Sequence, residues 1–173
     1  MSSNQAPVGG DLMTLSERLQ RVCLRRDVSV TAAESCTGGG VASAITDIAG
    51  SSAYFETGYV TYSNAAKTRL LGVSEAILDT HGAVSRETVE AMVAGACRDS
   101  GATLGVAISG VAGPGGGSPD KPVGTVWFAW GDAQVQESEC HHLPGTRDAV
   151  RGKAVRMALI GLIDRLEKAI SPA

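Results

Sequence analysis

The stretch "VSVTAAESCTGGGVASAITDIAG", residues 28–50, decides how the chain can fold. Residues 28–34 are small, apolar or β-branched and predict a buried strand, and residues 38–50 carry apolar side chains at helical spacing. A buried strand that leads directly into a helix is the unit from which α/β sheets are built. Ser35, Cys36 and Thr37 stand between the two, at the carboxyl end of the strand, where open α/β sheets bind their ligands.

The rest of the chain continues the same alternation. Further strands are predicted over residues 54–63, 102–110, 125–131 and 133–143, the last two as an antiparallel pair around residues 131–132. Helices are predicted over residues 12–25, 65–72, 85–100 and 144–170, with Asn64 and Ser85 as N-caps and Gly72 as a stop. The pattern therefore predicts one α/β domain, three-layered (α/β/α), with a mixed sheet.

Length and composition exclude several classes of protein. A chain of 173 residues fits one domain, with residues 1–11 as a flexible tail and residues 12–171 as the folded part. A net charge of −3 and an aromatic content of 4% argue against a nucleic-acid partner. There is no apolar stretch of the roughly 18 residues that a membrane span needs, and no signal peptide. We expect a cytoplasmic protein that needs neither a disulfide nor a metal.

Ser35 is the first candidate nucleophile, because it is expected at the exposed tip of the first strand. The amides of Thr37, Gly38 and Gly39 are expected to point outward from the first helical turn, with a partial positive charge. Such amides suit a phosphate or the oxyanion of an acyl transfer. The alternative is that Ser35 or Thr37 only caps the helix and that the glycines only ease packing.

Cys36 is a second candidate nucleophile, because a helix N-terminus lowers the pKa of a thiol. Against it stands the frequent simple burial of cysteine. A histidine base for either nucleophile has no local sequence support, since the three histidines are scattered at His81, His141 and His142.

Lys67 is the alternative base. It lies one turn into the short helix that follows the second strand, and a lysine can accept a proton if burial lowers its pKa. Tyr62 precedes it at the strand end and is expected to orient the ammonium or relay a proton. The plainer alternatives are a solvated lysine and a packing tyrosine.

A glycine-rich loop, "SGVAGPGGGSPDKPVG" (residues 109–124), follows the strand over residues 102–110. It lacks the ending of a P-loop, but its backbone allows close approach to a ligand. Arg147 stands at the start of the last helix, where the helix dipole disfavours a cation, so a nearby phosphate or carboxylate would explain it. A solvated arginine explains it equally well.

Five motifs in series resemble one known family. They are "AESCTGGG" within residues 33–40, "DIAGSSAYFETGYVTYSNAAK" at 47–67, "HGAVS" at 81–85, "ISGVAGPGGGSPDKPVGTVWFA" at 108–129 and "LPGTRDAVR" at 143–151. Together they resemble the C-terminal domain of the competence/damage-inducible protein CinA, the nicotinamide-nucleotide amidase family. The resemblance spans nearly the whole chain. It implies the stand-alone form, without the molybdopterin-binding-like domain that many members carry.

The resemblance implies an amidase. The family hydrolyses the carboxamide of nicotinamide mononucleotide (NMN) to nicotinate mononucleotide and ammonia, in pyridine nucleotide salvage, with no cofactor. Its serine, tyrosine and lysine fall on Ser35, Tyr62 and Lys67. The alternative is a non-catalytic nucleotide-binding or competence-related interaction module.

Two expectations about binding go with this reading. For the 5′-phosphate we expect donors from the glycine-rich loop and the last helix, namely Ser109, Gly110, Gly113 and Arg147. We also expect a homo-oligomer, as is usual for soluble enzymes.

Overall fold

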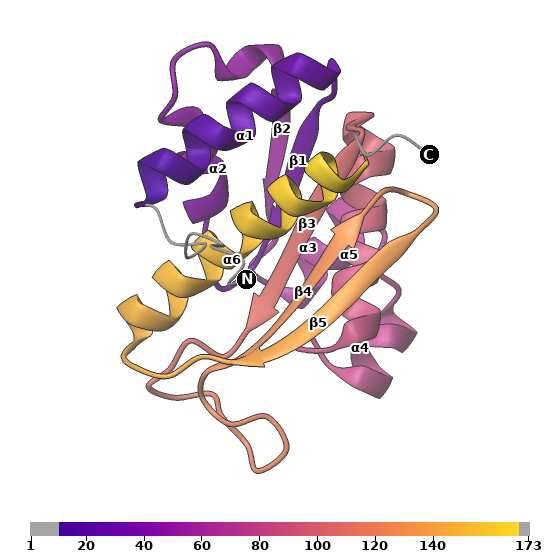
Figure 1. Cartoon of the computed structure of the whole chain (residues 1–173). Coiled ribbons are helices and arrows are strands. Elements are labelled where there is room, and N and C mark those ends of the chain that lie inside the picture. Colours follow the sequence, from indigo (N-terminus) through magenta and orange to yellow (C-terminus); the bar gives the residue numbers. More distant parts are fainter. Residues whose placement is uncertain (1–10, 170–173) are drawn as a thin grey trace, which may run out of the picture.

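The computed structural model describes residues 11–169, and its centre is a five-stranded mixed sheet in the order β2-β1-β3-β4-β5 (Figure 1). Its strands are β1 (Val30–Glu34), β2 (Phe55–Val60), β3 (Leu104–Gly110), β4 (Thr125–Gly131) and β5 (Gln136–His142). β1 runs parallel to both β2 and β3, whereas β4 is antiparallel to β3 and to β5. The predicted hairpin and the mixed sheet are confirmed.

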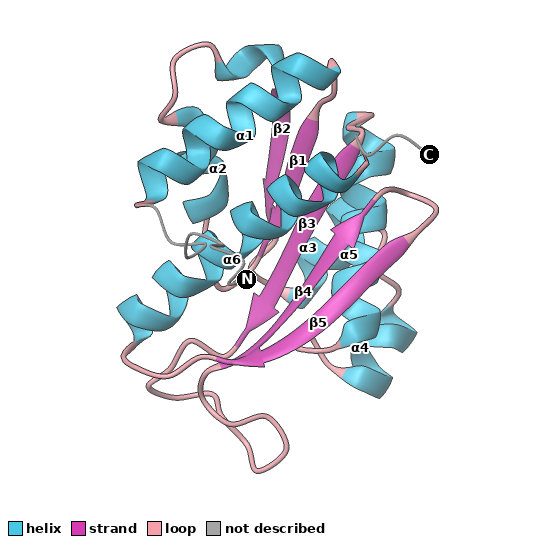
Figure 2. Ribbon diagram, in the orientation of Figure 1, coloured by secondary structure: helices cyan, strands magenta, loops and turns pink. Residues whose placement is uncertain are grey.

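Helices cover both faces of the sheet (Figure 2). Within residues 11–169 they are α1 (Leu12–Arg26), α2 (Gly40–Thr46), α3 (Asn64–Leu71), α4 (Glu75–His81), α5 (Arg86–Ser100) and α6 (Arg147–Lys168), with the 3₁₀ turn η1 (Ser51–Ala53) before β2. One apolar core lies between the sheet and α1, α2 and α6, and a second lies between the sheet and α3 and α5. The three-layer α/β/α domain expected from the sequence is confirmed.

Local sequence sets where the helices begin. Ser85 caps α5 as predicted, its Oγ accepting a hydrogen bond from the Thr88 amide at 3.2 Å. For α3, the cap is Ser63 and not Asn64, because the Ser63 hydroxyl accepts from the Ala66 amide at 3.0 Å. Either residue type can cap a helix, so the pattern alone left the start uncertain by one position.

Two further expectations differ from the structure. The helix predicted from residue 38 begins at Gly40, because Gly38 and Gly39 have φ angles of 59° and 104° and form a turn. Helix α4 was not predicted; none of its side chains is buried, so it has little apolar periodicity to reveal it. The expected tail over residues 1–11 lies outside the described residues, except Asp11, which caps α1.

The motifs with candidate functional residues lie together at one edge of the sheet. β1 and β3 are parallel and end side by side, with Glu34 opposite Ile108. The turn before α2, the start of α3, the start of α5 and the glycine-rich loop after β3 all lie at the ends of these strands. This carboxyl edge is where open α/β sheets place their ligands.

Candidate active site

Ser35 extends β1 by one residue at this edge. Its amide donates to the Ile108 carbonyl of β3 at 3.0 Å, which fixes its backbone against the central strands. The residue is only 8% exposed, so Ser35 is nearly buried and does not stand at an exposed strand tip as expected. A rigid strand end therefore carries the candidate nucleophile.

Lys67 is buried beside it, with 1% of the residue exposed. Its Nζ lies 3.1 Å from Ser35 Oγ and donates to the main-chain carbonyls of Thr61, at 2.9 Å, and Tyr62, at 3.3 Å. Burial lowers the pKa of the Lys67 ammonium, and the neighbouring Cys36 thiol opposes that shift. The three oxygens match the three N–H donors of the ammonium; once the amine has lost a proton, it keeps two donors for the carbonyls and has a lone pair for the Ser35 hydroxyl.

The hydrogen bond between Tyr62 and Lys67 is made by the main-chain carbonyl of Tyr62. Its side chain is 60% exposed, and its hydroxyl accepts a hydrogen bond from Arg147 Nη2 at 3.1 Å. The expected contact between the phenol and the lysine is therefore replaced by one between the phenol and Arg147. The cause is that β2 ends at Val60, so strand alternation does not set the direction of Tyr62.

The turn between β1 and α2 contains the three amides that the sequence offers to an oxyanion, those of Thr37, Gly38 and Gly39. The Gly38 amide is engaged, because it donates to the Ser35 carbonyl at 3.0 Å, so it is not one of the free donors expected from the sequence. Within residues 11–169, the amides of Thr37 and Gly39 have no acceptor. Two of the three expected donors therefore stay available to an oxyanion.

Glu34, the last residue of β1, holds this turn in place, and its role was not predicted from the sequence. Its buried carboxylate accepts hydrogen bonds from Thr37 Oγ1 at 2.6 Å, the Val41 amide at 2.8 Å and the Ala42 amide at 3.1 Å. It thus satisfies free amides in the first turn of α2, as an acidic residue near a helix N-terminus does. The Thr37 hydroxyl points to this carboxylate, which leaves only the Thr37 amide for a ligand.

Arg151 of α6 also holds this turn in place, and its role was not predicted from the sequence either. Its Nε donates to the Cys36 carbonyl at 3.1 Å and its Nη2 to the Thr37 carbonyl at 3.4 Å. In a trans peptide the C=O and N–H point in opposite directions. By holding the Cys36 carbonyl, Arg151 sets the direction of the Thr37 amide.

Cys36 does not have the surroundings of a reactive thiol. Burial raises its pKa to about 11, although Arg151 partly opposes the shift, so the thiol is protonated at neutral pH. The histidines lie elsewhere: His81 ends α4 near Glu87, and the other two are on β5. The side-chain contacts therefore favour the Ser35–Lys67 pair over a cysteine or a histidine base.

The four residues expected to bind phosphate fall into two groups. Gly113 and Arg147 lie together, since the Gly113 carbonyl accepts from Arg147 Nη1 at 2.8 Å. Ser109 and Gly110 end β3; Ser109 is buried, and a Cβ on Gly110 would lie 2.7 Å from a Val126 methyl. Packing against β4 thus accounts for the glycine at 110.

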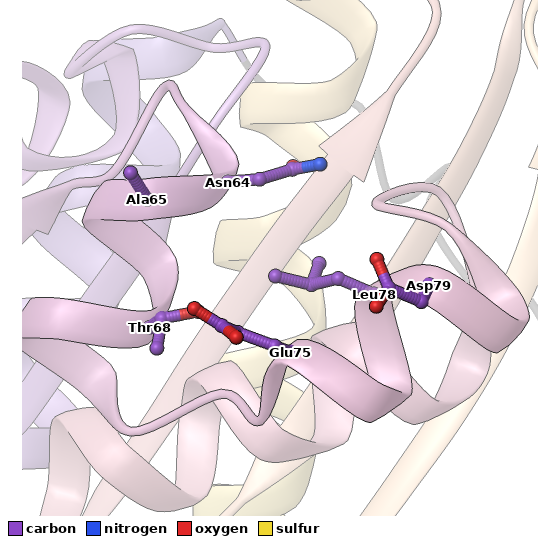
Figure 3. A pocket seen from close by; sticks show the side chains of 6 residues that line it. All are labelled: Asn64, Ala65, Thr68, Glu75, Leu78 and Asp79. Carbon is purple, nitrogen blue, oxygen red and sulfur yellow. The ribbon is translucent and has the colours of Figure 1, made fainter.

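A hollow of about 260 Å³ lies on the outer side of α3, against α4 (Figure 3). It is lined by Asn64, Ala65, Thr68, Glu75, Leu78 and Asp79. Lys67, on the same helix, is buried beneath it and faces Ser35. The two carboxylates of the hollow disfavour an anionic ligand there. Among the described residues, no three side chains of histidine, cysteine, aspartate or glutamate gather as a metal site.

The fold and this site define a class: a single-domain α/β protein with a serine–lysine pair at the carboxyl edge of its sheet. The family model of the CinA C-terminal domain matches residues 12–166, and the chain belongs to that family.

Named relatives agree with this membership. The chain is 59% identical over 152 residues to the nicotinamide-nucleotide amidohydrolase PncC of Pseudomonas putida, covering 88% of this chain and 95% of that protein. It is 53% identical to the protein of the same name from Escherichia coli K12, covering 86% and 91%. A CinA-superfamily crystal structure from Klebsiella pneumoniae 700603 superimposes with a TM-score of 0.88 at 39% identity, covering 92% and 99%.

Proposed function

We propose that this protein is a nicotinamide-nucleotide amidase that hydrolyses the carboxamide of NMN to nicotinate mononucleotide and ammonia, in pyridine nucleotide salvage. The observation that carries the proposal is the 3.1 Å approach of Lys67 Nζ to Ser35 Oγ in a buried site. The names of relatives up to 59% identical over most of the chain support the substrate. A serine activated by a neutral lysine is a known solution for acyl transfer.

In the proposed mechanism, Ser35 Oγ attacks the carboxamide carbon while the lone pair of Lys67 takes the serine proton. The amides of Thr37 and Gly39 stabilise the oxyanion of the tetrahedral intermediate. Collapse breaks the C–N bond, and the Lys67 ammonium returns its proton to the leaving ammonia. Water then attacks the acyl-enzyme, with Lys67 again accepting a proton, and Ser35 is released.

We assign roles to Tyr62, Arg147, Gly113, Ser109 and Gly110 from the contacts that each residue makes. Tyr62 orients Lys67 through its carbonyl, and its phenol and Arg147 form one wall of the site with Gly113. Ser109, next to Ser35 at the end of β3, forms the floor. Gly110 lets the loop leave β3 close to β4.

The test is ammonia release from NMN by wild type, Ser35→Ala and Lys67→Met proteins. The expected result is turnover by wild type that falls by at least 10² in both variants, with both variants still giving a cooperative unfolding transition. Ammonia release that persists in Ser35→Ala would refute the role of Ser35 as the nucleophile. A folded wild type that releases no ammonia from NMN would overturn the substrate.

We further infer a cytoplasmic homo-oligomer. All four cysteines are free, which fits a reducing compartment, and no helix in the described part of the chain is long and apolar enough to cross a membrane. Val60 on edge strand β2 and Leu70 on α3 are about half exposed, at 49% and 50%, and offer apolar contacts to a second copy. Light scattering on purified protein would test the assembly.

A further inference from the structure

We propose that a cavity at the N-terminus of α5 binds the 5′-phosphate of the nucleotide substrate, with Lys121 as its main ligand. The cavity has a volume of about 310 Å³, and Lys121, Arg86, His81, Glu87 and Trp127 are among its lining residues. The inference rests on the proposed function, and it moves the phosphate from Arg147 to the opposite side of Ser35.

The sheet places Trp127, one of the residues that line this cavity, close to the nucleophile. Ser35 is bonded to β3 at the position beside Ser109, and Ser109 pairs with Trp127 on β4. Trp127 packs on the face of the sheet that α3 and α5 cover, which is the face from which Lys67 reaches Ser35. Two strand spacings separate Ser35 from Trp127, or about 10 Å. The cavity therefore begins within the reach of a mononucleotide whose carboxamide lies at Ser35.

The charges in the cavity suit a phosphate dianion. Lys121 comes from the glycine-rich loop and Arg86 from the first turn of α5, so two permanent cations face one carboxylate, that of Glu87. This carboxylate lies 3.6 Å from His81 Nδ1, which partly offsets it when the ring is protonated. The free amides in the first turn of α5 add partial positive charge.

Lys121 is held in place without being saturated. Its Nζ donates to the His81 carbonyl at 2.7 Å, which ties the loop to the end of α4 and leaves two N–H donors for a ligand. Arg86 lies over the Trp127 ring, with 5.8 Å between its guanidinium carbon and the ring centroid. Both cations are thus positioned by neighbours that do not neutralise them.

Two other cavities suit a phosphate less well. The hollow between α3 and α4 contains Glu75 and Asp79 and no cation. A cavity of about 510 Å³ between β5 and α6 contains three carboxylates and two cations, and α6 covers the opposite face of the sheet from Lys67. Of the three, the α5 cavity alone combines excess positive charge with the face that Ser35 and Lys67 share.

The experiment compares NMN with nicotinamide riboside, the same molecule without its phosphate. Turnover of both is measured for wild type, Lys121→Met, Lys121→Arg and Arg86→Met, with Arg98→Met as the control at the far end of α5. Calorimetric binding of both compounds to Ser35→Ala, with and without Lys121→Met, gives a readout that needs no turnover. We expect Lys121→Met to raise the KM for NMN about tenfold to a hundredfold and to leave kcat and the riboside unaffected.

The results separate the phosphate-site proposal from the amidase proposal. Partial rescue by Lys121→Arg and a smaller effect of Arg86→Met support the site. Three results would overturn the phosphate site while leaving the amidase proposal in place. They are an unchanged KM for NMN in Lys121→Met, an equal loss of turnover with NMN and with nicotinamide riboside in that variant, and equal affinity of the wild type for the two compounds. Lys121-dependent binding of NMN without wild-type turnover has the opposite meaning: the phosphate site stands and the amidase proposal fails.

Discussion

Replacement of Lys67 by methionine removes the proposed base and keeps most of the side-chain volume. Lys67 is the one amine bonded to Ser35 among the described residues, so no neighbour replaces it. General-base catalysis contributes about 10²–10⁴ in rate, and we expect kcat for ammonia release to fall by that factor with KM nearly unchanged. That loss corresponds to about 3–5 kcal/mol of transition-state stabilisation.

The pH dependence gives a second readout of the same prediction. The rate requires neutral Lys67, so it should rise with pH and level off above the lysine pKa, which burial places below its ordinary value of 10.5. Because the folded pKa is lowered, the unfolded chain binds more protons between the two pKa values. Wild type should therefore gain stability relative to Lys67→Met as pH rises towards about 10.4.

Two controls make the assay decisive. Lys67→Arg keeps a cation that does not release its proton near neutral pH, so it should be as inactive as Lys67→Met. Lys153→Met removes an exposed lysine whose Nζ also donates to a main-chain carbonyl, that of Pro144, and should keep full activity. Lys67→Met protein that retains more than a tenth of the wild-type kcat, or an unaltered pH profile in it, would refute the reasoning.

Three further predictions concern the neighbours of Ser35. Cys36→Ala should keep most of the amidase rate, because the thiol pKa of about 11 leaves little thiolate; a loss matching that of Ser35→Ala would contradict this. Arg151→Met should lower kcat about tenfold to a hundredfold with KM little changed, because the Thr37 amide loses its orientation; a pure KM effect would argue for substrate binding instead. Glu34→Gln should lower the free energy of unfolding by about 1–3 kcal/mol in a urea titration, since an amide NH₂ would face the Ala42 N–H; an unchanged midpoint would show that the turn does not need the carboxylate.

The architecture was predictable because its signals are local and strong. The apolar run before Ser35, the cap at Ser85 and the hairpin around residues 131–132 each depend on neighbouring residues alone. Helix α4 escaped prediction because it buries no side chain, and the start of α3 was misplaced because both Ser63 and Asn64 can cap.

The site was predictable only in part, because its geometry joins distant segments. The approach of Lys67 to Ser35 was expected, but the choice of the Tyr62 carbonyl over its phenol depends on where β2 ends. Arg151 is separated from the turn it holds by more than a hundred residues of sequence. For Glu34 a signal existed: an acidic residue at the end of a buried strand, a few positions before a helix start, is a candidate cap.

The anchoring of Lys67 by main-chain carbonyls has a consequence for how this protein tolerates mutation. The carbonyls of Thr61 and Tyr62 exist whatever side chains stand at those positions, so no single substitution there deletes the lysine's acceptors. The exposed side chain at position 62 can then change without removing an acceptor of the lysine, whereas any replacement of Thr61 must still fit a fully buried position. Laboratory evolution towards other carboxamides would begin most safely at position 62, whose side chain is already turned to solvent.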